Sequence, residues 1–289
     1  MIERTHLVAV LGRGVIDDPA EAVLSAFDVG LTRGDGCFDA TRLEVSADGS
    51  VHVDHLDEHL ARLDRSARSL ELPAVDPDVW RELISDSLGA WNRPGEAVLR
   101  LMLSRGSEVS DESGPVGVLT IAPLPDSSRA CRTGISVATL SLGRPAEMDR
   151  DSAWLLGGVK TLSYAVNMAA AREAAARGAD DALFVSIDGL ALGAPRSALI
   201  WREGEQLATT RVDGTGILAS ITQSSIFAQA ERDGVETRFD LIEASRLPEV
   251  DGAWLVSSGR LVAPILALDG VALPTDDAWT AQLTRWAIA

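Results

Sequence analysis

Lysine occurs once in this chain, at Lys160, and arginine supplies the other 25 of its 26 basic residues. A guanidinium serves ordinary surface and ion-pairing roles, but it keeps its proton near neutral pH and does not condense with an aldehyde. A primary amine does condense with an aldehyde, and burial lowers its pKa. The neighbouring Leu155, Leu156 and Val159 are apolar, which suits burial. The sequence therefore indicates Schiff-base chemistry at Lys160; the alternative is an ordinary surface lysine in an arginine-rich chain.

Two motifs around this lysine are similar to those of a known family. The run Lys160–Asn167 reads Lys-Thr-Leu-Ser-Tyr-Ala-Val-Asn, and after an Ala-rich segment Gly178–Val185 reads Gly-Ala-Asp-Asp-Ala-Leu-Phe-Val. Together they resemble the lysine region of class IV pyridoxal-phosphate enzymes, which include branched-chain and D-amino-acid aminotransferases and aminodeoxychorismate lyase. The resemblance implies that Lys160 holds pyridoxal 5'-phosphate as a Schiff base and that Tyr164 belongs to the cofactor site.

A helix is expected from about Asp57 to Leu72, because apolar residues recur at helical spacing and Pro73 follows. Within it, His-Leu-Ala-Arg-Leu followed by Ser-Ala resembles the family pattern whose arginine binds the cofactor phosphate. The resemblance gives that role to Arg62, and a planar guanidinium suits a phosphate. The alternative is a solvated arginine opposite the apolar stripe, as is expected for Arg65 and Arg68.

A second candidate phosphate motif is Gly216–Thr222, which precedes an expected helix ending near Asp233. A glycine-containing loop before a helix offers unpaired amides and positive dipole to a phosphate, although ordinary capping by Ser220 or Thr222 produces the same pattern. The resemblance favours a phosphate, with a leucine on the pyridine ring and a later hydroxyl-bearing loop. Ser220 and Gln223 depart from the usual Gly and Arg. The cofactor-binding residues implied here are Leu218, Ile221, Thr222, Ser257 and Ser258.

The segment Asp28–Arg42 reads as a glycine-punctuated loop running into an alternating strand. Its run Gly34–Phe38 and the later Ser104–Gly106 resemble the lyase branch of the family, and Asp39 stands where many relatives carry Glu. In such enzymes this strand lines the substrate pocket. The resemblance therefore implies substrate-pocket roles for Arg33, Phe38 and Arg105.

One departure from the family concerns the ring nitrogen of the cofactor. Family members place a glutamate there, within a pattern resembling Glu-x-x-x-Ser-Asn-Leu, but here Gly193 replaces the Glu and Ala198 the Asn. Without a carboxylate the ring nitrogen holds a proton less readily and is a poorer electron sink. The nearby Arg196 is permanently cationic and would disfavour that proton further. We therefore expect weak proton-abstraction chemistry.

Three of the four histidines, His52, His55 and His59, fall in one short window. Their spacing matches no closed set of metal ligands, and a site there would need ligands from differing faces of a strand-to-helix junction. No metal is expected.

At 289 residues the chain exceeds the usual size of one domain, so two are expected. We place a small N-terminal α/β domain at 1–125, a polar linker at 126–132 and a larger C-terminal cofactor-binding domain at 133–289. The resemblance implies an α/β (α+β) fold of type IV, with a β-barrel-like sheet in the larger domain and the cofactor between the two. Other expected elements are helices Asp76–Trp91 and Thr161–Arg177 and strands His6–Leu11, Ala97–Ser104, Val116–Pro123, Ile135–Leu142, Ala182–Ile187 and Leu190–Trp201.

A net charge of -17 and a pI near 4.6 argue against nucleic acids and anionic membranes as partners. No apolar run approaches the roughly 20 residues of a membrane span, and the N-terminus lacks the apolar stretch of a signal peptide. Two cysteines are too few for a disulfide scaffold. A cytoplasmic location is expected, and the resemblance implies a homodimer that acts on a small amino substrate.

Within the family the lyase-like motifs favour aminodeoxychorismate lyase, which forms 4-aminobenzoate and pyruvate. The alternatives are an aminotransferase of D- or branched-chain amino acids and a catalytically weak or silent relative that binds the cofactor.

Overall fold

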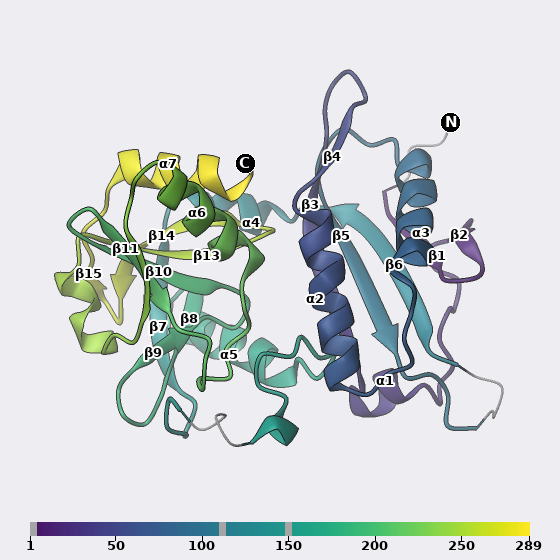
Figure 1. Cartoon of the computed structure of the whole chain (residues 1–289), viewed down its shortest axis with the longest axis horizontal. Coiled ribbons are helices and arrows are strands. Elements are labelled where there is room, and N and C mark those ends of the chain that lie inside the picture. The colour runs from purple at the N-terminus through teal and green to yellow at the C-terminus, as the bar shows by residue number, and fades with distance from the viewer. Residues whose placement is uncertain (1–4, 110–113, 148–151) are drawn as a thin grey trace. The chain divides into compact units, whose positions relative to one another are not determined.

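The computed structural model describes residues 5–109, 114–147 and 152–289. The chain forms two compact units (Figure 1). The first contains Met1–Pro125 together with a returning segment, Val159–Tyr164, and the second contains Asp126–Gly158 and Ala165–Ala289. The sequence predicts a single division of the chain, at the linker 126–132. In the structure the lysine segment Val159–Tyr164 lies beyond that boundary in the sequence but belongs to the first unit.

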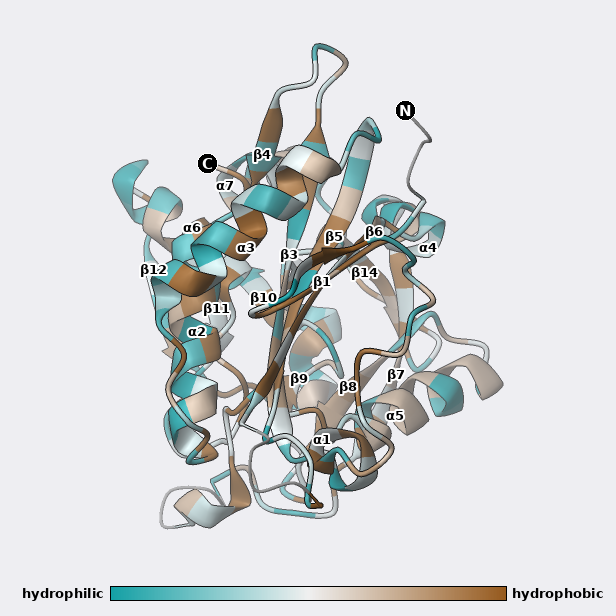
Figure 2. Ribbon diagram, turned by 90° about the vertical axis from the view of Figure 1, so that its right-hand side faces the viewer, coloured by the Kyte–Doolittle hydropathy of each residue, from teal (hydrophilic) through white to brown (hydrophobic). Residues whose placement is uncertain are grey.

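The first unit is an antiparallel six-stranded sheet in the order β2-β1-β6-β5-β3-β4, with two long helices packed against it (Figure 1). The core joins side chains of α2 and α3 to those of β3, β5 and β6. Figure 2 shows hydrophilic and hydrophobic residues interleaved along α2 and α3, whereas β5 and β6 are mostly hydrophobic. The elements are β1 (Leu7–Val10), β2 (Gly14–Ile16), α1 (Val29–Arg33), β3 (Gly36–Val45), β4 (Val51–Val53), α2 (Leu56–Ser69), α3 (Pro77–Ala90), β5 (Gly95–Ser104) and β6 (Val116–Pro123).

Local sequence explains the helices of this unit. In α2 the apolar stripe, which includes Leu60 and Leu63, is buried, as its spacing predicts. The helix ends at Ser69, and Glu71 adopts a left-handed φ of 52°, so the expected continuation to Leu72 is wrong. In α3 the Asp76 carboxylate accepts the amide of Asp78 and caps the helix.

The second unit is built on a curled nine-stranded sheet in the order β12-β11-β10-β13-β14-β7-β8-β9, with β15 beside β14. Near the two ends of this order, the Thr210 hydroxyl of β11 donates to the carbonyl of Ala191 in β9 over 3.2 Å. Helices α6 and α7 cover β10, β13 and β14 with one apolar cluster, and α5 packs small alanines against β7 and β8.

The bounds are α4 (Asp126–Ala130), η1 (Cys131–Thr133), β7 (Ile135–Ser141), η3 (Ala153–Leu155), α5 (Ala165–Ala176), β8 (Asp181–Val185), β9 (Ala191–Gly193), β10 (Ala198–Glu203), β11 (Gln206–Thr210), α6 (Ile221–Arg232), β12 (Thr237–Asp240), η4 (Ala244–Glu249), β13 (Gly252–Ser257), β14 (Leu261–Leu268), β15 (Val271–Ala272) and α7 (Asp277–Ala287).

The structure corrects several expected elements. The helix after the lysine begins at Ala165 rather than Thr161, because the preceding residues hydrogen-bond to β3. The expected strand Leu190–Trp201 is two strands separated by a tight turn, and its second part pairs with β11 and β13 instead of β8. The segment 126–132 forms short helical turns, and Val29–Arg33 is helical because Asp28 caps it. Among the described residues, no helix is long and apolar enough to cross a membrane.

Candidate active site

The backbone around Lys160 is fixed on two sides within the first unit. The Lys160 carbonyl accepts the amide of Phe38 at 2.9 Å, and the Leu162 amide donates to the carbonyl of Gly36 at 2.8 Å. On the other side, the Lys160 amide donates to the Ser66 hydroxyl of α2 at 3.3 Å. A Cβ at Gly36 would lie 2.5 Å from the carbonyl oxygen of Leu103 on β5 and 2.7 Å from Cδ1 of Leu162, so glycine at this position lets both segments approach β3 closely. The lysine is therefore held between β3 and α2.

The amine of Lys160 lies beside two aromatic rings, those of Phe38 and Tyr164. Its Nζ is 4.3 Å from the ring centre of Phe38 and 5.6 Å from that of Tyr164, and the two rings meet edge to face. Burial, with smaller contributions from the positive charges of Arg62 and Arg100, lowers the pKa of Lys160 from 10.5 to about 8, although the charge of Asp39 opposes the shift. The rings favour the protonated amine, but the cost of burying charge prevails. A usable share of this amine is neutral near physiological pH.

Asp39, His59 and Arg62 form a buried polar cluster beside the lysine. Arg62 donates two hydrogen bonds to the carboxylate of Asp39, from Nε to Oδ2 at 2.7 Å and from Nη2 to Oδ1 at 2.8 Å. The Nδ1 of His59 and the amide of Ala40 also reach Oδ1, each at 2.7 Å. Burial would raise the pKa of Asp39, but the hydrogen bonds and charges of Arg62 and His59 hold it well below its usual range. Burial lowers the pKa of His59.

Arg100 is a further candidate that the sequence motifs did not indicate. It lies on β5 opposite Ala40, two residues from Met102, which pairs with Phe38. Residues two apart on a strand share a face, so Arg100 points to the same side of the sheet as Phe38. Arg100 is solvent-exposed, yet close enough to Lys160 to lower the pKa of its amine.

The other two predicted substrate arginines have acidic partners. Arg33 pairs with Glu108 at 2.7 Å, and its side chain is 66% exposed. Arg105 donates from Nε to Asp35 at 2.6 Å and from Nη2 to the Leu70 carbonyl at 2.6 Å. The two lyase-like motifs thus meet through the Asp35–Arg105 pair. In this arrangement Arg105 shapes the loop before β3.

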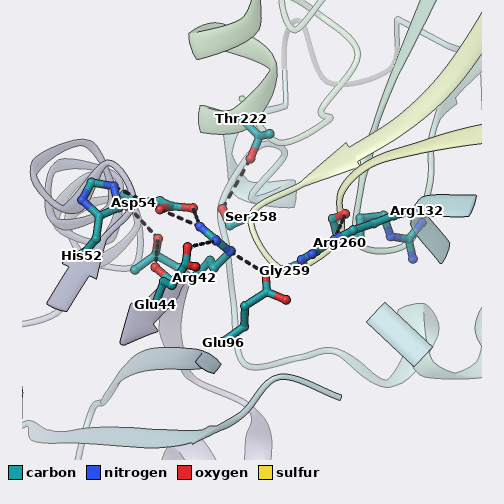
Figure 3. A network of polar contacts seen from close by, with 11 residues as sticks. Arg42, Glu44, His52, Asp54, Glu96, Arg132, Thr222, Ser258, Gly259 and Arg260 are labelled. Atoms are coloured by element: carbon teal, nitrogen blue, oxygen red, sulfur yellow. Dashed lines mark hydrogen bonds and ion pairs between the residues drawn. The ribbon is translucent and has the colours of Figure 1, made fainter. Parts of the chain in front are cut away.

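The predicted phosphate residues of the second unit gather at the start of α6. Ser220 caps that helix by accepting the amide of Gln223 at 3.2 Å. The hydroxyls of Thr222 and Ser258 lie 3.5 Å apart (Figure 3). Thr222 is buried, and the side-chain amide nitrogen of Gln223 is buried without a hydrogen-bond partner. Leu218 and Ser257 are half-buried beside these groups in sequence. Hydroxyls, helix amides and an unsatisfied amide donor suit an anion.

Two arginines, Arg132 and Arg260, stabilise the loop that carries Ser258 through hydrogen bonds and an ion pair. Arg132 donates to the carbonyls of Gly259 and Arg260 at 3.2 and 3.0 Å, and the buried Arg260 pairs with Asp181 at 2.7 Å. Upstream, the amide of Gly158 donates to the carbonyl of Gly216 at 2.9 Å, and Lys160 follows Gly158 by two residues.

Gly193 is buried at the end of β9, with a φ of 150° that L-residues rarely adopt. The turn that follows is closed by the Ala194 amide, which donates to the Ser197 carbonyl at 2.9 Å. A Cβ at Gly193 would lie 3.4 Å from that carbonyl oxygen. Arg196 is exposed in the turn. A glutamate at this position would strain the backbone.

In the part of the chain that the structure describes, no group of three or more His, Cys, Asp or Glu side chains could hold a metal ion. His59 belongs to the Asp39 cluster. His52 is exposed and approaches Asp54, which with Glu44 and Glu96 surrounds the buried Arg42 (Figure 3).

A family comparison agrees with this donor set. The profile of the class IV amino-transferase family matches residues 36–268. The chain belongs to this family. Its members depend on pyridoxal phosphate, so this protein is a pyridoxal-phosphate enzyme with the type IV fold. Each unit, taken by itself, carries groups that suit part of that cofactor: the amine of Lys160 and the guanidinium of Arg62 in the first, and the hydroxyls and helix amides at the start of α6 in the second.

Individual relatives cover nearly the whole chain. The chain is 36% identical to the bifunctional aminodeoxychorismate lyase / D-amino acid transaminase of Mycobacterium tuberculosis, over 90% of this chain and 91% of that protein. It resembles the solved fold IV transaminase of Curtobacterium pusillum with a TM-score of 0.89 and 37% identity, covering 99% and 98% of the two chains. A pyridoxal-phosphate-bound structure of a hypothetical aminotransferase from Mycobacterium tuberculosis gives a TM-score of 0.90 at 34% identity, covering 98% and 99%.

Proposed function

We propose that this enzyme is an aminodeoxychorismate lyase, which converts 4-amino-4-deoxychorismate to 4-aminobenzoate and pyruvate. The observation that carries the amine chemistry is the single lysine, half-buried against two aromatic rings with a pKa lowered to about 8. The choice of the lyase is supported by the Asp35 and Arg105 motifs and by the 36% identical relative, whose name includes that activity.

In this proposal Lys160 would be the residue that holds the aldehyde of the cofactor. Bound pyridoxal phosphate supplies an electron sink for the carbon next to the substrate nitrogen. The freed amine of Lys160 takes the proton from that carbon, which its lowered pKa favours near neutral pH. Loss of this proton and cleavage of the bond from the ring to the enolpyruvyl oxygen would leave the aromatic ring of 4-aminobenzoate. The departing enolpyruvate would take a proton back from the Lys160 amine and become pyruvate. Phe38 and Tyr164 keep water from the amine.

The phosphate of the cofactor would be held by Arg62, the amides of Ile221 and Thr222, and the hydroxyl of Ser258. A guanidinium and helix amides bind a dianion through charge-assisted hydrogen bonds. Ser257 lies next to Ser258, and Leu218 would pack on the pyridine ring.

A carboxylate of the substrate is best served by Arg100. It shares a face of the sheet with Phe38, next to the lysine, whereas Arg33 and Arg105 are already paired with Glu108 and Asp35. A guanidinium binds a carboxylate with two parallel hydrogen bonds. Arg100→Gln should therefore raise KM more than it lowers kcat.

A second candidate is transamination of D-amino acids, because the relative from Mycobacterium tuberculosis is named for both activities. The glycine at Gly193 argues for slow transamination, since no carboxylate stands at that position to hold a proton on the ring nitrogen. A branched-chain substrate and a catalytically weak cofactor binder are the remaining outcomes. The homodimer and the cytoplasmic location are part of the proposal, and light scattering of the purified protein tests the first.

The deciding experiment supplies purified, cofactor-loaded protein with 4-amino-4-deoxychorismate, and in parallel with a panel of amino donors and keto acids. Formation of 4-aminobenzoate without a keto acid supports the lyase. Turnover that requires a keto acid supports a transaminase. A coloured protein with neither activity supports a silent binder.

A further inference from the structure

Asp39 is a buried anion with an unusually complete set of donors. It is 1% exposed and accepts from Arg62 twice, from His59 and from the amide of Ala40. Neither the substrate nor the cofactor role proposed above uses it. These hydrogen bonds hold the Asp39 carboxylate in one orientation. The carboxylate in turn fixes the planar guanidinium of Arg62, which donates two hydrogen bonds to it.

Asp39 also supplies negative charge near the Lys160 amine. Among the residues that the structure describes, the charged groups that act on the amine are Arg62 from α2, Arg100 from β5 and Asp39 from β3, and Asp39 is the only anion of these three. Arg62 is buried and Lys160 is half-buried, and the charge of Arg62 is close enough to lower the pKa of the Lys160 amine. Two such cations repel each other strongly at low dielectric unless an anion lies close by.

We propose that Asp39 is the positioning residue of the lysine site: it holds the Arg62 guanidinium in one orientation and supplies the negative charge that lets the buried Arg62 and the half-buried Lys160 lie close together. The proposal rests on the proposed function in one respect, that the group Arg62 then meets is the cofactor phosphate. Its electrostatic part concerns the cofactor-free protein and stands apart from that function.

The single lysine makes the electrostatic part measurable at one atom. Protein grown with lysine labelled with ¹³C at Cε gives one lysine signal, from Lys160, and its chemical shift follows the protonation of Nζ. The full-length cofactor-free protein is titrated in this way as wild type, Asp39→Asn and Asp39→Glu. Asp64→Asn is the matched control, because Asp64 lies on α2 and pairs with Arg68 at the surface.

In Asp39→Asn the Lys160 titration should move down by at least about one pH unit, since loss of an adjacent opposite charge produces a shift of that size. Asp39→Glu keeps the charge and should stay within about half a unit of wild type, as should Asp64→Asn. A merely structural role for Asp39 would leave the titration where it is. A folded Asp39→Asn protein that titrates like wild type overturns the proposal.

A double variant covers the case in which Asp39→Asn does not fold. Arg62→Met together with Asp39→Asn removes both charges, and neutral replacement of a buried ion pair is tolerated better than removal of one partner. With Arg62 gone, the Lys160 titration should lie at or above the wild-type value. A titration below wild type in the double variant contradicts the charge balance.

The orienting part is tested with pyridoxal phosphate and with pyridoxal, which lacks the phosphate. Asp39→Asn should weaken the binding of pyridoxal phosphate about tenfold and the binding of pyridoxal less than about threefold, because only the phosphate contact depends on Arg62. Equal losses for both ligands overturn the orienting role. If wild-type protein binds neither ligand, the proposed function fails, while the lysine titration still decides the electrostatic part.

Discussion

Replacing Arg62 by alanine tests the phosphate assignment and the buried cluster together. Each charge-assisted hydrogen bond from a guanidinium to a phosphate contributes roughly 1.5–3 kcal/mol. Loss of one such contact corresponds to at least about a tenfold weaker cofactor affinity, because about 1.4 kcal/mol is tenfold. Arg62→Ala should therefore raise the Kd for pyridoxal phosphate by tenfold or more.

The same substitution removes two of the hydrogen bonds that Asp39 accepts. Breaking one partner from a buried ion pair costs about 3–5 kcal/mol, since the other charge stays buried. We expect a loss of stability near the lower figure, because His59 and the Ala40 amide still reach the carboxylate. The denaturation midpoint of the cofactor-free protein should fall accordingly.

Binding is therefore measured by absorbance titration at a temperature where circular dichroism shows the variant to be folded. Arg65→Ala is the control, because Arg65 lies on the same helix but is exposed. It should change neither affinity nor stability appreciably. Similar affinities for Arg62→Ala and wild type, or equal losses in the two variants, would refute the phosphate role of Arg62.

Four further outcomes are expected. Borohydride reduction of the cofactor-loaded protein should label only the peptide that contains Lys160, and peptide mapping that finds the label elsewhere excludes the proposed chemistry. The pKa of Lys160 lies below its unfolded value, so the cofactor-free protein should gain up to about 3 kcal/mol of stability as pH rises from about 8 to 10.5; denaturant unfolding of Lys160→Met should lack this gain. Thr222→Val and Ser258→Ala should each weaken cofactor binding, but not pyridoxal binding, by about tenfold. Gly193→Glu should cost roughly 1–3 kcal/mol of stability through backbone strain and, where folded, raise transaminase turnover; wild-type transamination with kcat on the order of 10 s⁻¹ would refute the idea that the missing carboxylate limits the rate.

Much of the scaffold follows from local sequence. The apolar stripe of α2, the Asp76 cap of α3 and the alternation of β6 all predict the observed elements, and β6 has the expected bounds Val116–Pro123. These features depend on residues a few positions apart, so a single sequence contains the information.

The lysine segment shows where local information ends. Thr161–Tyr164 reads as the start of an Ala-rich helix, but its backbone pairs with β3, more than 100 residues earlier, and the helix begins only at Ala165. Hydrogen bonds to a distant strand outweigh helix propensity, which spans at most about 0.7 kcal/mol per residue for ordinary residues. For the same reason the sequence does not indicate Arg100 as a candidate, because only the pairing of β3 with β5 places it on the same face of the sheet as Phe38.

The composition did contain one more usable signal. Tyr164 is the only tyrosine in the chain, as Lys160 is the only lysine, and the two lie together. Strand alternation also places Asp39 on the inward face of β3, between the buried Cys37 and Thr41. A carboxylate at an inward position needs a positively charged partner. The next helix in the sequence, α2, carries an arginine, Arg62, within its buried face. Sequence reasoning of this kind reaches the Asp39–Arg62 pair, but only the fold shows that the pair lies close enough to Lys160 to act on the pKa of its amine.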